Sequence, residues 1–120
     1  MNNKQQLGVY GENLIATKLE HEGFKILARN YKKRSGEIDL IAAKQSLLVF
    51  VEVKMRRSPL FDLAEVITRS KQQKILTVAK QFIVTHNHKD SMCRFDVALI
   101  EMRNAIPHIT YIPNAFGEDG

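Results

Sequence analysis

The stretch that decides the fold reads GEIDLI at residues 36–41 and VFVEVK at residues 49–54. It places Asp39, Glu52 and Lys54 among Val, Ile, Leu and Phe residues. Burying a charge without a partner or a metal is energetically expensive, so packing alone does not explain these side chains. Asp39, Glu52 and Lys54 are therefore the first candidates for a functional site.

The two runs are expected to pair as an antiparallel β-hairpin. Residues 38–43 and 47–54 are too short and too β-branched for helices, and the polar residues 44–46 between them have the length of a hairpin turn. Both faces of the second run are largely apolar, which is typical of a strand covered on both sides. We therefore expect residues 47–54 to form a central strand with helices on both of its faces.

The register of this hairpin brings the charged residues together. A turn centred between residues 45 and 46 predicts that Asp39 lies opposite Glu52, and opposite side chains are about 4.5–5.5 Å apart at Cβ. Because side chains alternate along a strand, Lys54 shares a face with Glu52. A slip of one residue would move Glu52 to the other face, so this register is a testable prediction.

Helices are expected on either side of the hairpin. Apolar residues at helical spacing predict a helix over residues 5–21, with Gly23 just beyond its end, and a second helix over residues 69–85 with Thr68 as its N-cap. Glu12 lies within the first helix. From its position in the helical pattern alone, Glu12 is an ordinary glutamate on the helix surface.

Three more strands complete the expected fold. They span residues 24–28, 95–102 and 106–112, and the last is expected at a sheet edge because it contains a proline. The expected irregular segments are the loops 29–35, 57–63 and 86–90 and the tail 113–120. The order of elements predicts one domain spanning residues 1–120, with an α/β fold in which a small mixed β-sheet is flanked by helices.

The charge pattern favours an anionic partner. Eighteen Lys and Arg against thirteen Asp and Glu give a net charge of +5 and a pI near 9.5. Basic residues lie on both sides of the acidic pair Asp39 and Glu52 in the sequence. Arg34 precedes the pair, Arg56 follows it closely, and Lys71 and Lys74 come further on. This distribution predicts nucleic-acid binding, the alternative being a solvated charged surface.

Cysteine content and hydropathy indicate a reducing, cytoplasmic location without a membrane partner. No stretch has the apolar length of a membrane span, and the first residues lack the apolar core of a secretory signal. The single cysteine, Cys93, can form no internal disulfide. We expect Cys93 to be a small buried residue beside a strand.

The acidic pair suits a divalent cation. Two carboxylates about 4 Å apart repel by roughly 4 kcal/mol at an effective dielectric constant near 20. Mg²⁺ prefers oxygen ligands and is usually held by one or two carboxylates, to which the carbonyl of Val53 could add a further oxygen. Lys54 would then hold or help to activate a water and stabilise charge on a phosphate. The alternative is a cross-strand salt bridge among Asp39, Glu52 and Lys54 at a sheet edge.

An ordered set of motifs resembles a known bacterial family. Asp39 followed by Glu52-Val53-Lys54, after a helix that carries Glu12, is similar to the PD-(D/E)XK nuclease superfamily. The closer resemblance is to the YraN/UPF0102 family, and the motifs that carry it are Gly11-Glu12, Arg29-Asn30, GEIDLI, VFVEVK-x-Arg56, Thr68-x-x-Lys71-Gln72, Arg94-Phe95-Asp96-Val97 and Ala115-Phe116. Where the family often has Pro-Ala, this chain has Arg69-Ser70, a departure at the helix start that leaves the candidate ligands unchanged.

The resemblance implies a restriction-endonuclease-like core related to archaeal Holliday junction resolvases. It implies that Asp39 and Glu52 are ligands of Mg²⁺ or Mn²⁺ and that Lys54 is the catalytic lysine. Glu12 gains a role that spacing does not give it, as a first-helix carboxylate that faces the site and binds the metal through water. Arg56 and Lys71 would face phosphate. Asp96 also matches a motif of the family. The alternative is that Asp96 simply forms an ion pair with a basic neighbour.

The implied activity is metal-dependent endonucleolytic hydrolysis of DNA, with branched or structured DNA as candidate substrates. The alternative is a non-catalytic nucleic-acid-binding or protein-interaction module that retains the fold. A module that only binds has no need of all three residues Asp39, Glu52 and Lys54. A homodimer formed through the late strands is a further hypothesis, since an enzyme that cuts two strands benefits from two sites.

Overall fold

The computed structural model describes residues 3–56 and 66–117. Its elements confirm the predicted order of helices and strands. The described helices are α1 (Asn3–His21) and α3 (Arg69–Thr85), and the strands are β1 (Lys25–Lys33), β2 (Gly36–Lys44), β3 (Leu47–Arg56), β4 (Met92–Arg103) and β5 (Ile106–Phe116). Neither described helix is long and apolar enough to cross a membrane.

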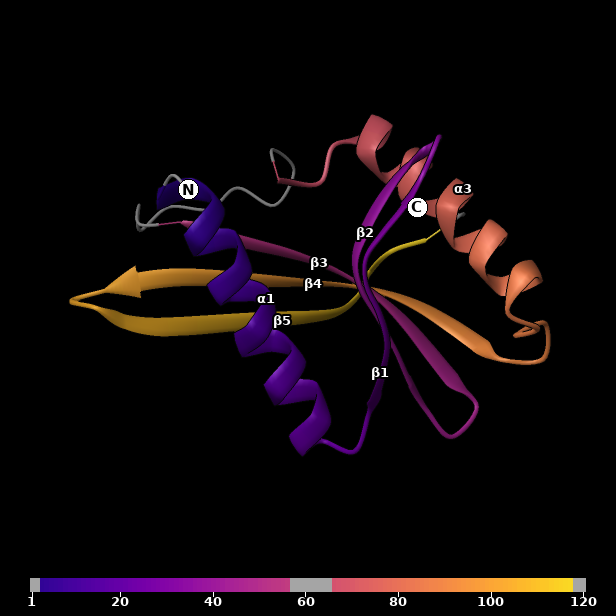
Figure 1. Ribbon diagram of the computed structural model, residues 1–120, viewed down its shortest axis with the longest axis horizontal. Coiled ribbons are helices and arrows are strands. Elements are labelled where there is room, and N and C mark those ends of the chain that lie inside the picture. Colours follow the sequence, from indigo (N-terminus) through magenta and orange to yellow (C-terminus); the bar gives the residue numbers. More distant parts are fainter. Residues whose placement is uncertain (1–2, 57–65, 118–120) are drawn as a thin grey trace.

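The five strands form one mixed sheet in the order β1-β2-β3-β4-β5. Strands β3 and β4 run parallel, and every other neighbouring pair is antiparallel. Figure 1 shows the β1–β2 hairpin standing steeply against the direction of β3, β4 and β5, as the twist of a sheet requires. The predicted α/β class with a small mixed sheet is confirmed, and it is compatible with a restriction-endonuclease-like core. β5 lies at an edge, as expected.

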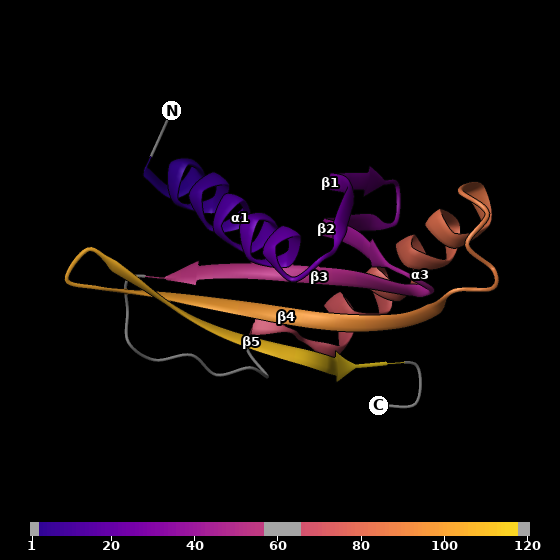
Figure 2. The ribbon, with the colours of Figure 1, turned by 90° about the horizontal axis from the view of Figure 1, so that it is seen from below.

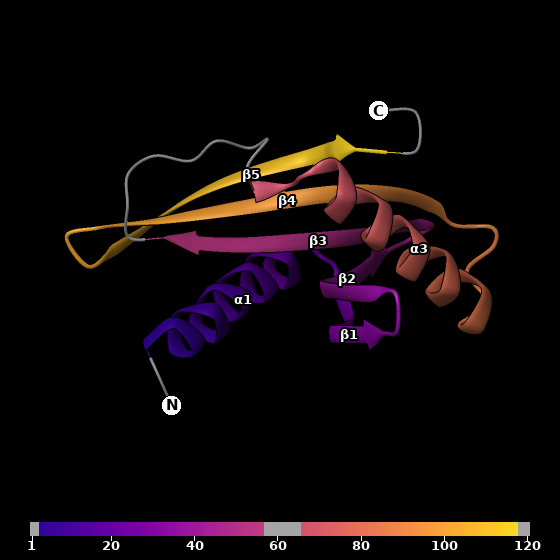
Figure 3. The same cartoon turned by 90° about the horizontal axis from the view of Figure 1, so that it is seen from above.

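The helices α1 and α3 cover opposite faces of the sheet around the central strand β3 (Figures 2 and 3). Ile15 and Leu19 of α1 belong to one buried cluster with Val51, whereas Phe82 of α3 belongs to the other with Phe50. Successive residues of β3 therefore enter different cores, because side chains alternate along a strand. The expectation of a central strand covered on both sides is confirmed.

The predicted hairpin register is confirmed for the pairs of residues 40–44 with residues 47–51, but the predicted pair of Asp39 with Glu52 is not part of the ladder. Ile41 pairs with Phe50 and Leu40 with Val51, and the recorded ladder between β2 and β3 ends there. From that point β2 continues to Gly36 paired with β1. Asp39 therefore stands one step beyond the last pair, at the place where the two strands separate.

Both predicted helix signals act as expected. Gly23 has φ +95°, and the N–H groups of Gly23 and Phe24 donate to the carbonyls of Glu20 and Leu19 at 3.0 and 2.9 Å. These two bonds form the Schellman ending of a helix. At the start of α3, the Thr68 side chain accepts the N–H of Lys71 at 3.2 Å, which makes Thr68 the N-cap.

Two segments expected to be irregular belong to strands instead. The predicted loop 29–35 is wrong, because β1 runs to Lys33 and leaves only a turn at residues 34–35. As an edge strand, β1 keeps exposed polar side chains without losing its pairing to β2. The predicted tail also begins too early, because β5 continues to Phe116, which pairs with Phe95. The predicted loop 57–63 and the last residues of the tail, 118–120, lie outside the described part of the chain.

Cys93 is exposed, so the expectation that it is buried is wrong. It lies at the start of β4, where the neighbouring Met92 is also exposed and donates its N–H to the carbonyl of Ser46 in the β2–β3 turn. Full burial along β4 begins only at Asp96. The first residues of β4 therefore lie beside a hairpin turn, outside the cores that the helices cover.

Candidate active site

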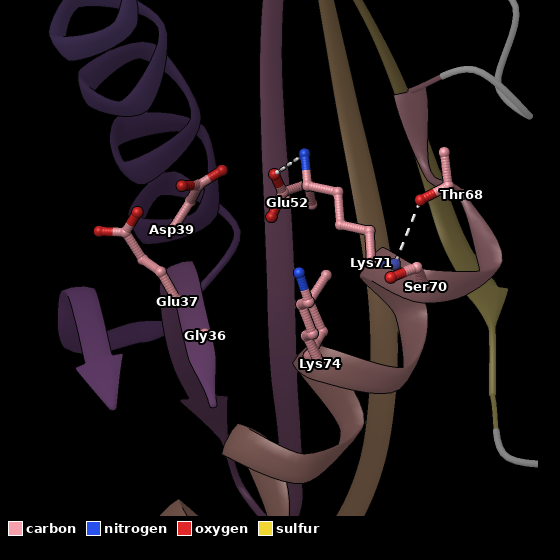
Figure 4. Close-up of a pocket in the computed structure, with 9 residues that line it drawn as sticks. Gly36, Glu37, Asp39, Glu52, Thr68, Ser70, Lys71 and Lys74 are labelled. Carbon is pink, nitrogen blue, oxygen red and sulfur yellow. Dashed lines mark hydrogen bonds and ion pairs between the residues drawn. The ribbon is translucent and has the colours of Figure 1, made fainter. Parts of the chain in front are cut away.

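A cavity of about 440 Å³ lies where β2 separates from β3, next to the first turns of α3 (Figure 4). A close approach of β2 to α3 bounds it, since a Cβ on Gly36 would come within 3.2 Å of the Cβ of Lys74. The lining residues come from three elements and the N-cap position: Gly36, Glu37, Asp39, Glu52, Thr68, Ser70, Lys71, Lys74 and Ile75. The structure thus gathers Asp39 and Glu52 at one cavity.

Asp39 is half-buried, and its Oδ2 accepts the backbone N–H of Val53 at 2.8 Å. Burial, as the largest cause, and the negative charge of Glu52 together raise the pKa of this carboxyl to about 7. The hydrogen bond from Val53 and the charge of Lys71 act in the opposite direction without cancelling this effect. The Asp39 carboxyl therefore keeps its proton to a higher pH than an exposed aspartate does.

Glu52 is buried, with 8% of its surface exposed, and it forms an ion pair with Lys71. The distance from Lys71 Nζ to Glu52 Oε1 is 2.9 Å (Figure 4). The alternative of an edge-strand salt bridge among Asp39, Glu52 and Lys54 is therefore wrong, because β3 is central and the cation at Glu52 comes from α3.

Lys54 and Val53 extend the site along β3. Lys54 is half-buried and follows Glu52 by two positions, which puts both on one face of the strand, although Lys54 lies outside the lining of the cavity. The N–H of Val53 points to Asp39. Because the N–H and C=O of one strand residue point to the same side, the carbonyl of Val53 faces the same gap.

Glu12 lies on the neighbouring side of the hairpin rather than in this cavity. Its Oε1 accepts the amide N–H of Asn30 at 3.1 Å, and both residues line a second hollow of about 530 Å³. Burial raises the pKa of Glu12, and the charge of Asp39 adds to that rise. Within residues 3–56 and 66–117, no group of three or more His, Cys, Asp or Glu side chains is arranged to hold a metal ion. Glu12 is thus near Asp39 without forming a common ligand set.

The four candidate phosphate-binding residues divide into two groups. Lys71 and Lys74 line the cavity from successive turns of α3. Arg34 lies exposed in the β1–β2 turn, and Arg56 lies exposed at the end of β3, and neither belongs to the cavity lining.

Sequence reasoning missed Glu37 and Ser70, which also line the cavity. The alternation of side chains gave a usable signal for Glu37, because Glu37 and Asp39 are two residues apart on one strand. For Ser70 the sequence held no comparable signal. Its position depends on the packing of α3 beside β2.

Asp96 has a structural position away from the cavity. It is fully buried, accepts two hydrogen bonds from Arg94 at 2.9 Å, and is also bonded by the hydroxyl of Tyr111 and the N–H of Asn114. The interpretation that Asp96 pairs with a basic neighbour is confirmed. This network lies at the irregularity between Phe95 and Val97, where β5 accommodates extra residues.

Comparison with known proteins gives a consistent result over most of the chain. The model of a family described as "Uncharacterised protein family UPF0102" matches residues 11–100. A UPF0102 protein of Caldanaerobacter subterraneus subsp. tengcongensis is 40% identical over 118 residues, which cover 95% of this chain and 97% of the relative. The UPF0102 protein of Dictyoglomus thermophilum is 42% identical over 119 residues, covering 97% and 100%. That of Saccharophagus degradans is 43% identical over 113 residues, covering 92% of each chain.

Proposed function

We propose that this chain, which belongs to the uncharacterised protein family UPF0102, is a Mg²⁺-dependent endonuclease that hydrolyses phosphodiester bonds in DNA. The fold would be that of the PD-(D/E)XK nucleases, and branched or structured DNA is the candidate substrate. The observation that carries the proposal is the cavity between β2 and β3, where Asp39 and Glu52 meet Lys71 and Lys74. Carboxylates for a cation and cations for phosphate are thus placed side by side.

The donor set fits a hard divalent cation. Asp39 and Glu52 offer carboxylate oxygens, and the carbonyl of Val53 faces the same gap. A bound cation would offset both the burial and the negative charge of Glu52, which together raise the pKa of Asp39. Two carboxylates and a carbonyl suit Mg²⁺, which commonly keeps waters and substrate phosphate oxygens as its other ligands. Mn²⁺, which also prefers oxygen ligands, would fit the same set.

The neighbouring residues supply the remaining roles. When bound, the cation would polarise a phosphoryl oxygen of the scissile bond. Lys54 would stabilise the charge that develops on the phosphate during attack by water, which breaks the bond between phosphorus and the leaving oxygen. Lys74 would bind a flanking phosphate, with Arg34 and Arg56 contacting the backbone further out. Glu12, held by Asn30, would act through water at the rim of the site.

Cleavage of labelled DNA tests the proposal. Duplex, single-stranded and four-way-junction substrates are incubated with Mg²⁺, Mn²⁺ or EDTA. We expect metal-dependent cutting that Lys54→Ala reduces by about 100-fold or more, the size expected from losing one transition-state contact. Lys89→Ala is the matched control, because Lys89 lies exposed in the loop after α3.

Two results would overturn the nuclease proposal. One is the absence of metal-dependent cutting of all three substrates, and the other is cutting that survives both EDTA and Lys54→Ala. DNA binding that weakens with salt, without any cutting, would favour the non-catalytic nucleic-acid-binding module.

A further inference from the structure

We infer that Lys71 is a stand-in cation for the metal site. It neutralises Glu52 while no divalent ion is bound and is released to the phosphate backbone when the ion arrives. This inference rests on the proposed function. Its basis is the ion pair of Lys71 with Glu52, the residue proposed above as a metal ligand.

Glu52 is buried whereas Lys71 is partly exposed, and a cation that is to be displaced by a metal ion must be able to reach solvent. The Glu52 side chain is 9% exposed, whereas the Lys71 side chain is 39% exposed. A buried carboxylate is costly without a positive partner, so Glu52 needs a cation in the metal-free protein. Lys71, on its flexible four-carbon stem, can swing towards solvent without disturbing the core.

The helix holds the backbone of Lys71 independently of the ion pair that its side chain makes with Glu52. Its N–H donates to the side chain of Thr68, the N-cap of α3, and this bond holds the first turn of the helix at the cavity. Release of the ammonium group therefore requires side-chain rotation only. The helix turn that carries the side chain stays in place.

A divalent ion and the Lys71 ammonium compete for the same carboxylate. The ammonium contacts Oε1 of Glu52, and an ion held between Glu52 and Asp39 would place two positive charges close to it. Attraction to Glu52 is then replaced by repulsion from the ion. The ammonium would then turn into the cavity that Lys71 lines together with Lys74, where a phosphate would lie.

The exchange of the Lys71 ammonium for a metal ion at Glu52 couples metal binding to nucleic-acid binding. Without the ion, Lys71 is occupied by Glu52 and contributes little to phosphate binding. With the ion, both Lys71 and Lys74 face the substrate. By thermodynamic linkage DNA then also tightens metal binding, because it holds Lys71 away from Glu52.

Metal affinity is measured by calorimetric titration of Mn²⁺ into the metal-free, full-length protein at one fixed pH. Removing the competing ammonium in Lys71→Met is expected to tighten Mn²⁺ binding about five- to tenfold. Lys74→Met is the matched control, since it removes an equal charge from the same cavity without touching the ion pair at Glu52, and its effect is expected to be smaller. Glu52→Gln is expected to abolish binding at this site.

The unsubstituted protein provides a second measurement that does not depend on a variant folding. The side-chain ammonium signal of Lys71 is followed by ¹H–¹⁵N NMR during titration with diamagnetic Mg²⁺. It is expected to move to the position of a solvated lysine, at the same Mg²⁺ concentrations that saturate the site. The signal of Lys74 serves as the internal reference.

The outcomes separate this inference from the proposed function. If Mn²⁺ binds and Glu52→Gln abolishes binding, but Lys71→Met binds no more tightly than Lys74→Met, the stand-in role is overturned and the nuclease site stands. An unchanged Lys71 signal at saturating Mg²⁺ has the same meaning. If Mn²⁺ binding is absent, or is indifferent to Glu52→Gln, the metal site and the stand-in role both fall.

Discussion

Replacing Asp39 by Asn is expected to stabilise the metal-free protein at pH 8. The substitution keeps an oxygen that can accept the N–H of Val53, the bond that Asp39 makes at 2.8 Å. It removes a negative charge that is partly buried and lies near the charge of Glu52. The residue proposed as a metal ligand thus costs stability in the absence of its metal.

The magnitude follows from the pKa of Asp39. Burial and the charge of Glu52 raise this pKa from 3.8 to about 7. Between these two pH values the folded protein binds more protons than the unfolded chain, so the contribution of Asp39 is favourable below pH 4 and is lost as pH rises through 7. At about 1.36 kcal/mol per pKa unit, the loss amounts to at most ~4 kcal/mol. Because an amide is a weaker acceptor than a carboxylate, we expect Asp39→Asn to recover about half of this.

Urea unfolding in EDTA, at pH 5 and pH 8, measures the effect. The free energy of unfolding of Asp39→Asn should exceed that of the unsubstituted protein by about 2 kcal/mol at pH 8 and by much less at pH 5. Glu37→Gln is the control, because Glu37 is an exposed carboxylate on the same strand and lines the same cavity. Glu37 raises the pKa of Asp39 less than burial and Glu52 do, so Glu37→Gln should change the free energy of unfolding less than Asp39→Asn does. The reasoning is refuted if Asp39→Asn is less stable at pH 8, or if its effect is equal at both pH values.

Three further substitutions probe the helix end, the buried network and the cavity. Gly23→Ala is expected to cost about 1–2 kcal/mol in urea unfolding because the residue has φ +95°, and Gly23→Asn should cost less. Arg94→Met leaves Asp96 buried without its counterion and should cost about 3 kcal/mol, part of which Asp96→Asn in the same chain should restore; an additive double variant would contradict this pairing. Lys74→Met should lower the slope of log affinity for DNA against log salt by about 1, and an unchanged slope would remove Lys74 from the phosphate contacts.

The sequence by itself determined the hairpin and the position of its charges. The pairing of Ile41 with Phe50 follows from a short polar turn between two β-branched runs, and both are local features. The central place of β3 follows from its apolar character on both faces. Period 2 then put Glu52 and Lys54 on one face without any long-range information.

The sequence was less informative at the edges of the sheet. The polar residues of β1 and the last part of β5 resemble loops, because an edge strand needs only one neighbour and leaves its other side to solvent. In β5 the residues before Phe116 keep their place through Asp96, which accepts the N–H of Asn114 from the neighbouring strand. Such a contact joins residues far apart in the chain.

Only the tertiary structure decided what surrounds the acidic pair. The separation of β2 from β3 beyond Leu40 opens the cavity, and the packing of α3 beside β2 brings Lys71 to Glu52. The tertiary structure also places Glu12 of α1 beside Asn30, in a separate hollow next to this cavity. The physical reason is that the register of a hairpin depends on residues close in sequence, whereas these contacts depend on how a helix and a sheet distant in sequence fill space together.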